Sequence, residues 1–535
     1  MPRIKLLYVL LIMGVALCLS QIWWPHYYLT GDGPCHLYNA NVLHNIWNNN
    51  DVAFYSKFYQ VIYDPNPNWL SHILLGLPLY FTNGVIAEKL FLSVYAGLLI
   101  GGFFLLMKKV SGSSSYWITL IFLFVFHHTL AKGFYNFSLS TAFYFWMLWS
   151  WLRFIDKRNT INTLVFFLFT GLIFFTQLLP FVFGVITCLS LAVSYALAKE
   201  RGDSVLPVNN FLKSTITLGI LVAPFAVLMF RFTNKEGGMN IELHHHFYRL
   251  IELVQFKYAI NATNKEAFFC AIAGITIISL LIVSIAVRLK GKFSFHKYDG
   301  FLISLFIIMG VYLFFPEDFM KRVILMSMRA QLYVLALAVL YISCTLSQQI
   351  KNAGGVILFV CFAGLTIIRI KNMAVASEAA EDYNSVAHFI PAHAVVLPLD
   401  FAPGGKDKNG KVISDFNYLF VHALHYSAVE KSWIMLDNYE ANAGYFPLLW
   451  TYKTNPYTHL SRNEGIEAHP PSADITAYTN YSGVSVDYVV LWGYDSSYLN
   501  KGQYKELDNQ IKTAYHLVYT SPTNHTLLYE KNKPL

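Results

Sequence analysis

Apolar and polar residues alternate in long blocks along residues 1–370 of the chain. Apolar stretches of about 17 to 23 residues recur there, and each is long enough to cross a hydrocarbon core of about 30 Å as an α-helix. The pattern predicts a polytopic α-helical membrane protein with about 11 transmembrane helices. These helices are expected at residues 4–24, 86–107, 116–131, 134–154, 162–178, 180–198, 212–230, 266–288, 299–315, 330–347 and 353–370.

Two segments between the predicted spans have the pattern of helices that lie on the membrane surface. Residues 69–81 are too short to cross the membrane and are bracketed by the Pro-rich sequence DPNPN and by TNG. In the loop 231–265, several apolar residues share one face of a predicted helix. They are Leu243, Phe247, Leu250, Ile251 and Val254.

The basic residues between the spans indicate the orientation of the chain. With a cytoplasmic N-terminus, four basic clusters fall on one side of the membrane, as the positive-inside rule requires. They are Lys108 and Lys109; Arg153, Lys157 and Arg158; Lys199 and Arg201; and Arg288, Lys290, Lys292 and Lys297. An odd number of spans then places the C-terminus outside, on the same face as the outer loops 25–85 and 231–265.

The pattern changes after Lys371. A polar helical stretch at 377–389 is followed by short runs typical of strands, at 393–399, 433–437, 486–492, 515–519 and 526–529. We therefore expect a transmembrane domain at 1–371 and a small extracytoplasmic α/β domain at 372–535.

Composition agrees with a membrane protein, because 55% of the residues are hydrophobic, 17% are aromatic and only 13% are charged. The net charge of +8 does not indicate nucleic-acid binding, since the basic residues lie mainly in links between spans. The six cysteines form neither a metal-binding nor a disulfide pattern. The first apolar run continues through Trp23 and Trp24 without a small-x-small cleavage pattern, so we interpret it as an uncleaved span.

The most informative polar segment is TGDGPCHLYNANVLHNIW, at residues 30–47 in the first outer loop. Pro34 can open a helix after Asp32 and Gly33. Asp32 could then cap the helix, or it could act as a catalytic carboxylate. His36 lies four residues after Asp32 and could share its helix face.

The first 113 residues resemble the opening of GT-C glycosyltransferases. The resemblance rests on the order of four features: an Asp soon after the first span, a Pro-containing link, a short interfacial helix, and a second span closed by basic residues. The segment DPNPNWLSHILLGLPLYFTNGVIAEKLFLSVYAGLLIGGFFLLMKKVSGS, at 64–113, is similar to the branch of protein mannosyltransferases and bacterial aminoarabinose transferases. The resemblance implies a polyprenyl-phosphate sugar donor, a lipid, glycan or protein acceptor, and a bacterial inner membrane with a periplasmic C-terminal domain. It assigns Asp32 the role of general base.

A leaving polyprenyl phosphate carries negative charge, so a cation must stand near its oxygen. The link before the tenth span offers Lys321, Arg322 and Arg329. Alternatively, these residues extend to lipid head groups or pair with Glu317 and Asp318. We favour Arg329, because it lies deepest in the predicted span.

Polar residues between the third and fourth spans are further candidates for the sugar site. His128, Lys132 and Asn136 could contact the substrate, or they could anchor a short hairpin at the head groups. His244, His245 and His246 cannot converge on one ion, because consecutive helical residues point about 100° apart. No cofactor is certain; a divalent metal with Asp32 as one ligand is possible, but the sequence places no second acid to complete its site.

In the C-terminal domain, Asp437, Asn438, Tyr439 and Glu440 follow a strand-like run, and His422 and His425 precede it. Such residues could recognise an acceptor sugar, or they could form a loop cluster that satisfies itself. Two other functions stay open for the whole chain. One is a lipid or glycolipid transporter or flippase, and the other is a catalytically inactive membrane scaffold.

Overall fold

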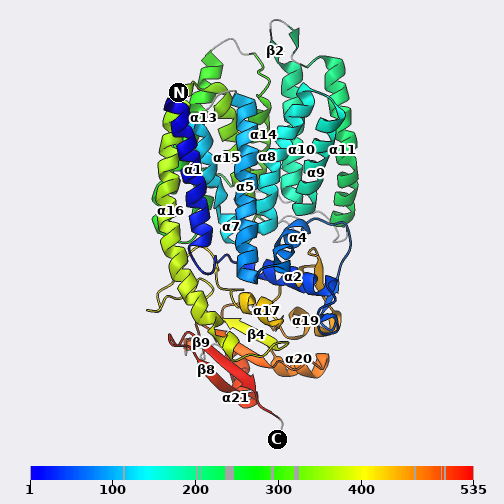
Figure 1. Ribbon diagram of the computed structural model, residues 1–535, viewed down its shortest axis with the longest axis vertical. Coiled ribbons are helices and arrows are strands. Elements are labelled where there is room, and N and C mark those ends of the chain that lie inside the picture. The colour runs from blue at the N-terminus through cyan, green and yellow to red at the C-terminus, as the bar shows by residue number, and fades with distance from the viewer. Residues whose placement is uncertain are drawn as a thin grey trace.

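The computed structural model of the chain is mostly helical, with a small β-sheet near the C-terminus. It describes residues 2–111, 115–200, 203–204, 206–234, 246–290, 294–317, 325–462, 465–495, 497–498 and 502–533. Figure 1 shows an upright bundle of helices with a smaller C-terminal part at one end and the N-terminus at the other. The fold therefore separates a long apolar bundle from a compact part rich in polar residues.

Among the described residues, seven helices are long and apolar enough to cross a membrane. They are α1 (Pro2–Trp23), α5 (Gly84–Ser111), α10 (Leu178–Leu197), α11 (Val208–Asn234), α13 (Ala267–Lys290), α15 (Met326–Thr345) and α16 (Gln348–Asn384). Their length and composition are those of an integral membrane protein.

The other four predicted spans are also helical, but their helices are too short, too polar or interrupted to count as membrane-spanning by length and composition. The shorter helices α9 (Thr160–Thr176) and α14 (Gly300–Phe314) occupy two of them, and the less apolar α8 (Tyr135–Asp156) occupies a third. The segment 116–131 is broken into η2 (Tyr116–Leu120), α6 (Ile121–Val125) and α7 (His128–Ala131). The break lies at Phe126 and His127, whose backbones leave the helical region.

The first outer loop folds into short helices at the end of the bundle. It contains α2 (Gly33–Trp47), α3 (Val52–Tyr55), α4 (Leu70–Gly76) and η1 (Pro78–Tyr80). Helices α2 and α4 lie between the bundle and the C-terminal part (Figure 1). The predicted helix of the loop 231–265 appears as α12 (Arg249–Val254), with Ile251 exposed, while Leu243 lies outside the described residues.

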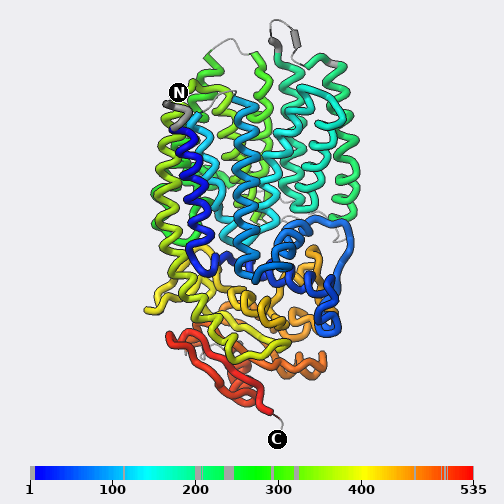
Figure 2. The backbone as a smooth tube through the Cα atoms, in the orientation of Figure 1, coloured from blue at the N-terminus to red at the C-terminus, as the bar shows by residue number. Residues whose placement is uncertain are grey.

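Helix α16 joins the bundle to the C-terminal part. Its 37 residues run without a break through position 371, where the sequence pattern changes. In Figure 2 the same segment descends along the outside of the bundle, beside α1, and enters the smaller part. The two regions thus share one continuous helix.

All five predicted strands of the C-terminal region belong to one sheet, in the order β5-β4-β7-β9-β8. The strands are β4 (Val395–Asp400), β5 (Ile434–Met435), β7 (Tyr488–Trp492), β8 (Tyr515–Thr520) and β9 (Thr526–Lys531). β4 runs parallel to β5 and β7, whereas β9 is antiparallel to β7 and β8. Every residue of β4 and β7 is buried, as expected for strands covered on both faces.

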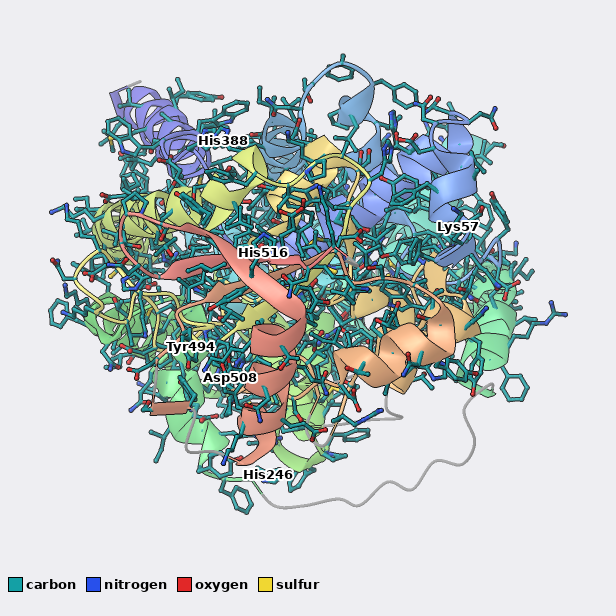
Figure 3. All side chains as sticks on the ribbon, turned by 90° about the horizontal axis from the view of Figure 1, so that it is seen from below. Lys57, His246, His388, Tyr494, Asp508 and His516 are labelled. Atoms are coloured by element: carbon teal, nitrogen blue, oxygen red, sulfur yellow. The ribbon has the colours of Figure 1, made fainter. Side chains whose placement is uncertain are left out.

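Short elements complete the C-terminal part. They are η5 (Ser385–His388), α17 (His425–Lys431), α18 (Glu440–Ala443), β6 (Leu448–Trp450), η6 (Tyr452–Thr454), α19 (Pro456–His459), α20 (Ile475–Ser482) and α21 (Gly502–Ala514). In the end-on view of Figure 3, β8 with His516 and α21 with Asp508 cross in front of the bundle. β6 pairs with β1 (Tyr59–Val61), so the first loop and the C-terminal part share backbone hydrogen bonds.

The remaining short elements lie in the links of the bundle. They are the hairpin of β2 (Lys199–Glu200) and β3 (Asp203–Ser204), η3 (Lys257–Ala259) and η4 (Asn264–Glu266). The hairpin lies at the end of the bundle opposite the C-terminal part (Figure 1).

We predict that Gly355→Ala destabilises the bundle. A Cβ atom at Gly355 in α16 would lie 2.4 Å from the backbone carbonyl of Tyr116, so the two segments would have to separate. Overpacking of this kind costs about 1–3 kcal/mol. The measurement is the melting temperature of the detergent-purified protein, which should fall.

The matched control is Gly97→Ala in α5, where an added Cβ meets no atom within 4 Å. Alanine favours a helix more than glycine does, so this variant should melt at or above the wild-type temperature. Equal melting temperatures for the two variants would contradict the close packing of α16 on η2.

Candidate functional site

The backbone around Asp32 is fixed against the link between α7 and α8. The amide of Asp32 donates to the carbonyl of Lys132 at 2.9 Å, and the amide of Gly31 donates to the carbonyl of Ala131 at 3.0 Å. Gly133 has a φ of +87°, and a Cβ atom there would lie 2.3 Å from the Asp32 nitrogen. Glycine at position 133 therefore permits the close approach that places Asp32.

The carboxylate of Asp32 does not cap the helix that follows it. Asp32 occupies the N-cap position of α2, yet its side chain makes no capping hydrogen bond. Instead it lines a pocket together with the Tyr439 side chain. The structure therefore disagrees with the capping interpretation of Asp32.

The surroundings of Asp32 shift its proton affinity upward. Burial raises the pKa of the carboxyl group above its usual range, whereas His422 and His36 oppose that rise. A carboxylate with a raised pKa takes up a proton more readily near neutral pH. Asp32 thus has the property required of a general base.

The pocket that contains Asp32 is small, about 70 Å³, and lies where the first loop, the bundle and the C-terminal part meet. Acidic, basic, amide and aromatic side chains surround it. The lining residues are Asp32, His36, Asn68, Phe134, Asn136, Phe137, Gln177, Arg329, Tyr439, Tyr445 and Phe446.

Arg329 brings a buried positive charge to this pocket. It lies in the first turn of α15, and only 6% of the residue is exposed. Its guanidinium lies 4.8 Å from the ring centre of Phe134 and 5.3 Å from that of Phe137. Within the described part of the chain, no carboxylate pairs with it, and its Nε and Nη1 atoms have no hydrogen-bond partner. A buried cation of this kind favours the binding of an anion.

Asn136 adds another unused donor to the pocket. Its Oδ1 atom accepts a hydrogen bond of 2.6 Å from the Ser71 hydroxyl, whereas its buried Nδ2 atom has no partner in the described structure. Buried N–H groups without partners are rare in folded proteins. Arg329 and Asn136 together therefore offer donors that suit an oxygen-rich ligand.

An apolar cavity of about 440 Å³ adjoins the polar pocket and shares Asn68, Gln177 and Tyr445 with it. Its walls come mainly from the ends of four helices, α10, α11, α14 and α15. The other lining residues are Pro67, Leu178, Leu179, Val182, Phe183, Ile186, Met229, Phe230, Phe232, Thr233, Val311, Phe315 and Met326. The combined space fits a molecule with a charged group at one end and an apolar chain at the other.

The structure brings together five of the residues that the sequence singled out: Asp32, His36, Asn136, Arg329 and Tyr439 all line the pocket. His128 does not line the pocket; its Nδ1 atom instead lies 2.5 Å from the carbonyl of Ile260. Lys132 contributes its backbone carbonyl to the position of Asp32, and its side chain is not part of the lining. The predicted phosphate ligands Lys321 and Arg322 lie outside the described residues.

The sequence did not single out His72, which lies beside the pocket and contacts the same carboxylate as His36. His36 Nδ1 lies 2.6 Å from Glu440 Oε1, and His72 Nε2 lies 2.8 Å from Glu440 Oε2. All three side chains are buried. Although burial alone raises the pKa of Glu440, the two histidines lower it to about 2. The local sequence signal for the contact between His72 and Glu440 was weak: a His in a short interfacial helix, four residues after Asn68.

A second carboxylate also lies between two histidines. Asp437 Oδ2 is 3.1 Å from His422 Nδ1, and its Oδ1 is 2.9 Å from His425 Nε2. Burial alone lowers the pKa of His422, but Asp437, Glu467 and Asp32 together raise it to about 9. His422 therefore carries a proton at neutral pH and pairs with Asp437.

Comparison with protein-family models and with curated proteins does not identify this site. The chain matches no protein-family model and no curated protein. Its function must therefore be inferred from the chemistry of the residues themselves.

We predict that the protein loses stability as the pH rises from about 6.5, the ordinary pKa of His, to about 9. The folded-state pKa of His422 is raised, so its stabilising effect is complete below the unfolded pKa and disappears as the pH passes the folded pKa. Asp437 stays charged throughout this range, because His425 and His422 hold its pKa below its usual value despite burial. The measurement is the melting temperature across this range.

The control for this prediction is His422→Gln, which keeps a hydrogen-bond donor but cannot titrate. This variant should show a much weaker fall in melting temperature over the same pH range. A fall of equal size in the variant would show that another group is responsible. Glu467, Asp32 and His425 also face His422, so their substitution would be the next test.

Proposed function

We propose that this chain is a GT-C-like membrane glycosyltransferase that moves a sugar from a polyprenyl-phosphate donor to an acceptor at the outer face of the membrane. One observation carries the proposal. A partly buried carboxylate, Asp32, and a buried guanidinium without a described carboxylate partner, Arg329, line one pocket beside an apolar cavity. These are the parts that a reaction of a lipid-linked phosphate requires.

In the proposed reaction, Asp32 takes the proton from an acceptor hydroxyl or amine. The acceptor atom attacks the anomeric carbon of the sugar, and the bond from that carbon to the phosphate oxygen breaks. The bonding electrons leave with the polyprenyl phosphate, whose negative charge Arg329 offsets. Asn136 donates to an oxygen of the sugar or phosphate, and the prenyl chain occupies the apolar cavity.

The proposal includes the topology. About 11 transmembrane helices would place the N-terminus in the cytoplasm of a bacterium and the C-terminal part in the periplasm, with the inner membrane between them. Support comes from the arrangement of the bundle, in which the two termini lie at opposite ends (Figure 1). The basic residues Lys108 and Lys109 end α5, so they lie at the N-terminal side, as the positive-inside rule requires.

A lipid transporter or flippase is the second candidate, and the apolar cavity beside Arg329 favours it. A transporter needs the cation and the cavity but has no use for a base at Asp32. The two proposals therefore differ in what they require of the carboxylate. Exchange of a lipid phosphate across vesicles without any sugar transfer would favour the transporter.

We predict that Asp32→Asn lowers sugar transfer by at least about 100-fold, the lower end of the contribution of a general base. The amide keeps the shape of the side chain but cannot take the proton. The measurement is transfer of radiolabelled sugar from a panel of synthetic polyprenyl-phosphate sugars. The control is Asp51→Asn in the same loop, because Asp51 lies 3.0 Å from His393, outside the pocket. Wild-type transfer by Asp32→Asn would exclude the proposed mechanism.

We predict that Arg329→Met abolishes binding of polyprenyl phosphate but stabilises the ligand-free protein. Methionine fits between the rings of Phe134 and Phe137 and removes a buried charge that has no described carboxylate partner. The melting temperature without ligand should therefore rise, whereas the further rise on adding polyprenyl phosphate should vanish.

The matched control for this variant is Arg153→Met, because Arg153 also lies over an aromatic ring, 4.7 Å from the centre of Trp149, but does not line the pocket. This variant should keep the ligand-induced rise. An unchanged response to polyprenyl phosphate in Arg329→Met would exclude Arg329 as the phosphate ligand.

A further inference from the structure

Three buried side chains from separate elements converge beside the pocket. His36 comes from α2, His72 from α4 and Glu440 from α18. One potential ligand atom from each lies within 4.8 Å of the others. Two imidazoles and one carboxylate are a common donor set for Zn²⁺, and catalytic sites of this kind keep a further position open.

A neutral His72 ring has one N–H group, but both of its ring nitrogens contact oxygen atoms that accept hydrogen bonds. Its Nδ1 atom lies 3.1 Å from the carbonyl of Asn68, and a carbonyl can only accept, so the ring proton belongs on Nδ1. The Nε2 atom then presents a lone pair to Glu440 Oε2, which also has only lone pairs. A proton, on the ring or on the carboxyl group, or a metal ion must therefore lie between these two atoms.

The contact of His36 with Glu440 is unfavourable for a different reason, its geometry. Nδ1 and Oε1 are 2.6 Å apart, yet both atoms are buried without a hydrogen bond of acceptable geometry. Two polar atoms so close and unaligned are unfavourable unless a cation contacts both. The pair is therefore better explained by a shared ligand than by a direct hydrogen bond.

The atoms around the cluster are arranged as in an outer coordination shell. A metal-binding His usually donates its other ring N–H to a carbonyl, as His72 does to Asn68. A metal-binding carboxylate usually accepts a further hydrogen bond, and Asn39 Nδ2 donates to Glu440 Oε2 at 3.0 Å. Asn68 itself adopts a φ of +70°, a sparsely populated backbone conformation.

The neighbouring cluster at Asp437 differs in these respects. Its carboxylate oxygens have aligned ring donors in His422 and His425, and the unused Nδ1 of His425 has no partner in the described structure. Cys35 lies near both rings and would complete a rival set, but its thiol donates to Asn438 Oδ1 at 3.4 Å. Ring protons satisfy both oxygens of the Asp437 carboxylate, so this carboxylate needs no metal ion.

We propose that His36 Nδ1, His72 Nε2 and the Glu440 carboxylate bind one divalent transition-metal ion, with Zn²⁺ the best match to the donor set. Binding requires the ligand atoms, now 2.6 and 2.8 Å apart, to separate by roughly 0.5–0.8 Å, because tetrahedral Zn²⁺ ligands lie about 3.3 Å from one another. His36 also lines the pocket that contains Asp32 and Arg329, so the ion would lie beside that pocket. The ion would tie the first loop to the C-terminal part and offer an anion a second contact there. This inference does not depend on the proposed glycosyl transfer.

The test measures metal binding by the full-length detergent-purified protein. After removal of metal and titration with ZnCl₂, we expect one equivalent to bind per chain by calorimetry and elemental analysis. His72→Ala and Glu440→Gln should lose it, whereas Asn39→Ala should weaken it by about 10- to 100-fold. Cys35→Ser and His422→Gln should bind Zn²⁺ as the wild type does.

Two measurements on the wild type guard against variants that fail to fold. A chelator should lower its melting temperature, and ZnCl₂ should restore it. With Co²⁺, the His36, His72 and Glu440 set should give visible ligand-field bands without a thiolate-to-cobalt charge-transfer band. Such a charge-transfer band, or loss of binding in Cys35→Ser alone, would move the ion to the Cys35 set and overturn the proposal. Absence of Zn²⁺ binding by the folded wild type would also overturn it.

Discussion

The whole pocket depends on a buried polar contact between helix α2 and residues 437–440. Asn39 Nδ2 donates to Glu440 Oε2 at 3.0 Å, and Asn438 Nδ2 donates back to Asn39 Oδ1 at 2.8 Å. The Tyr38 hydroxyl donates to the carbonyl of Trp433 at 2.9 Å. Since buried polar groups without partners are costly, any sliding of α2 along this surface would leave several groups unsatisfied at once. The contact therefore fixes the start of α2, and with it the carboxylate of Asp32.

Three buried arginines show why Arg329 is singled out. Arg249 lies 2.7 Å from a carboxylate oxygen of Glu317 and also donates to backbone carbonyls. Arg369 lies 2.8 Å from a carboxylate oxygen of Glu266. Both charges are thus neutralised locally, as is usual for buried ions. Arg329 has aromatic rings on its faces and no such carboxylate among the described residues, so its charge is still available for a ligand.

Periodicity predicted the elements better than it predicted the site. Long apolar runs and alternating strands leave a local signal, so the first loop helix at Pro34 and the five strands after residue 393 were found. The length of α16 was missed, because its polar second half does not resemble a span. Asp32 was selected because the resemblance to GT-C glycosyltransferases assigns it the role of general base. Arg329 was selected because a charged residue within a predicted span is a functional candidate. His72 and Glu440 could not be paired in advance, because 368 positions separate them and only the packing of α4 on the C-terminal part brings them together.

The position of the polar pocket decides which kind of ligand it suits. The apolar cavity is formed by the ends of bundle helices, and the pocket lies beyond those ends, beneath the first loop and α18. A wholly polar ligand would leave the cavity unfilled, and a wholly apolar ligand would leave the Arg329 guanidinium without an anion. Only an amphiphile with an anionic group at the junction satisfies both regions at once. Because Arg329 is buried, its attraction to the anion is stronger than it would be at the protein surface. Burial also raises the pKa of Asp32, so a single feature of the fold prepares both the cation and the base.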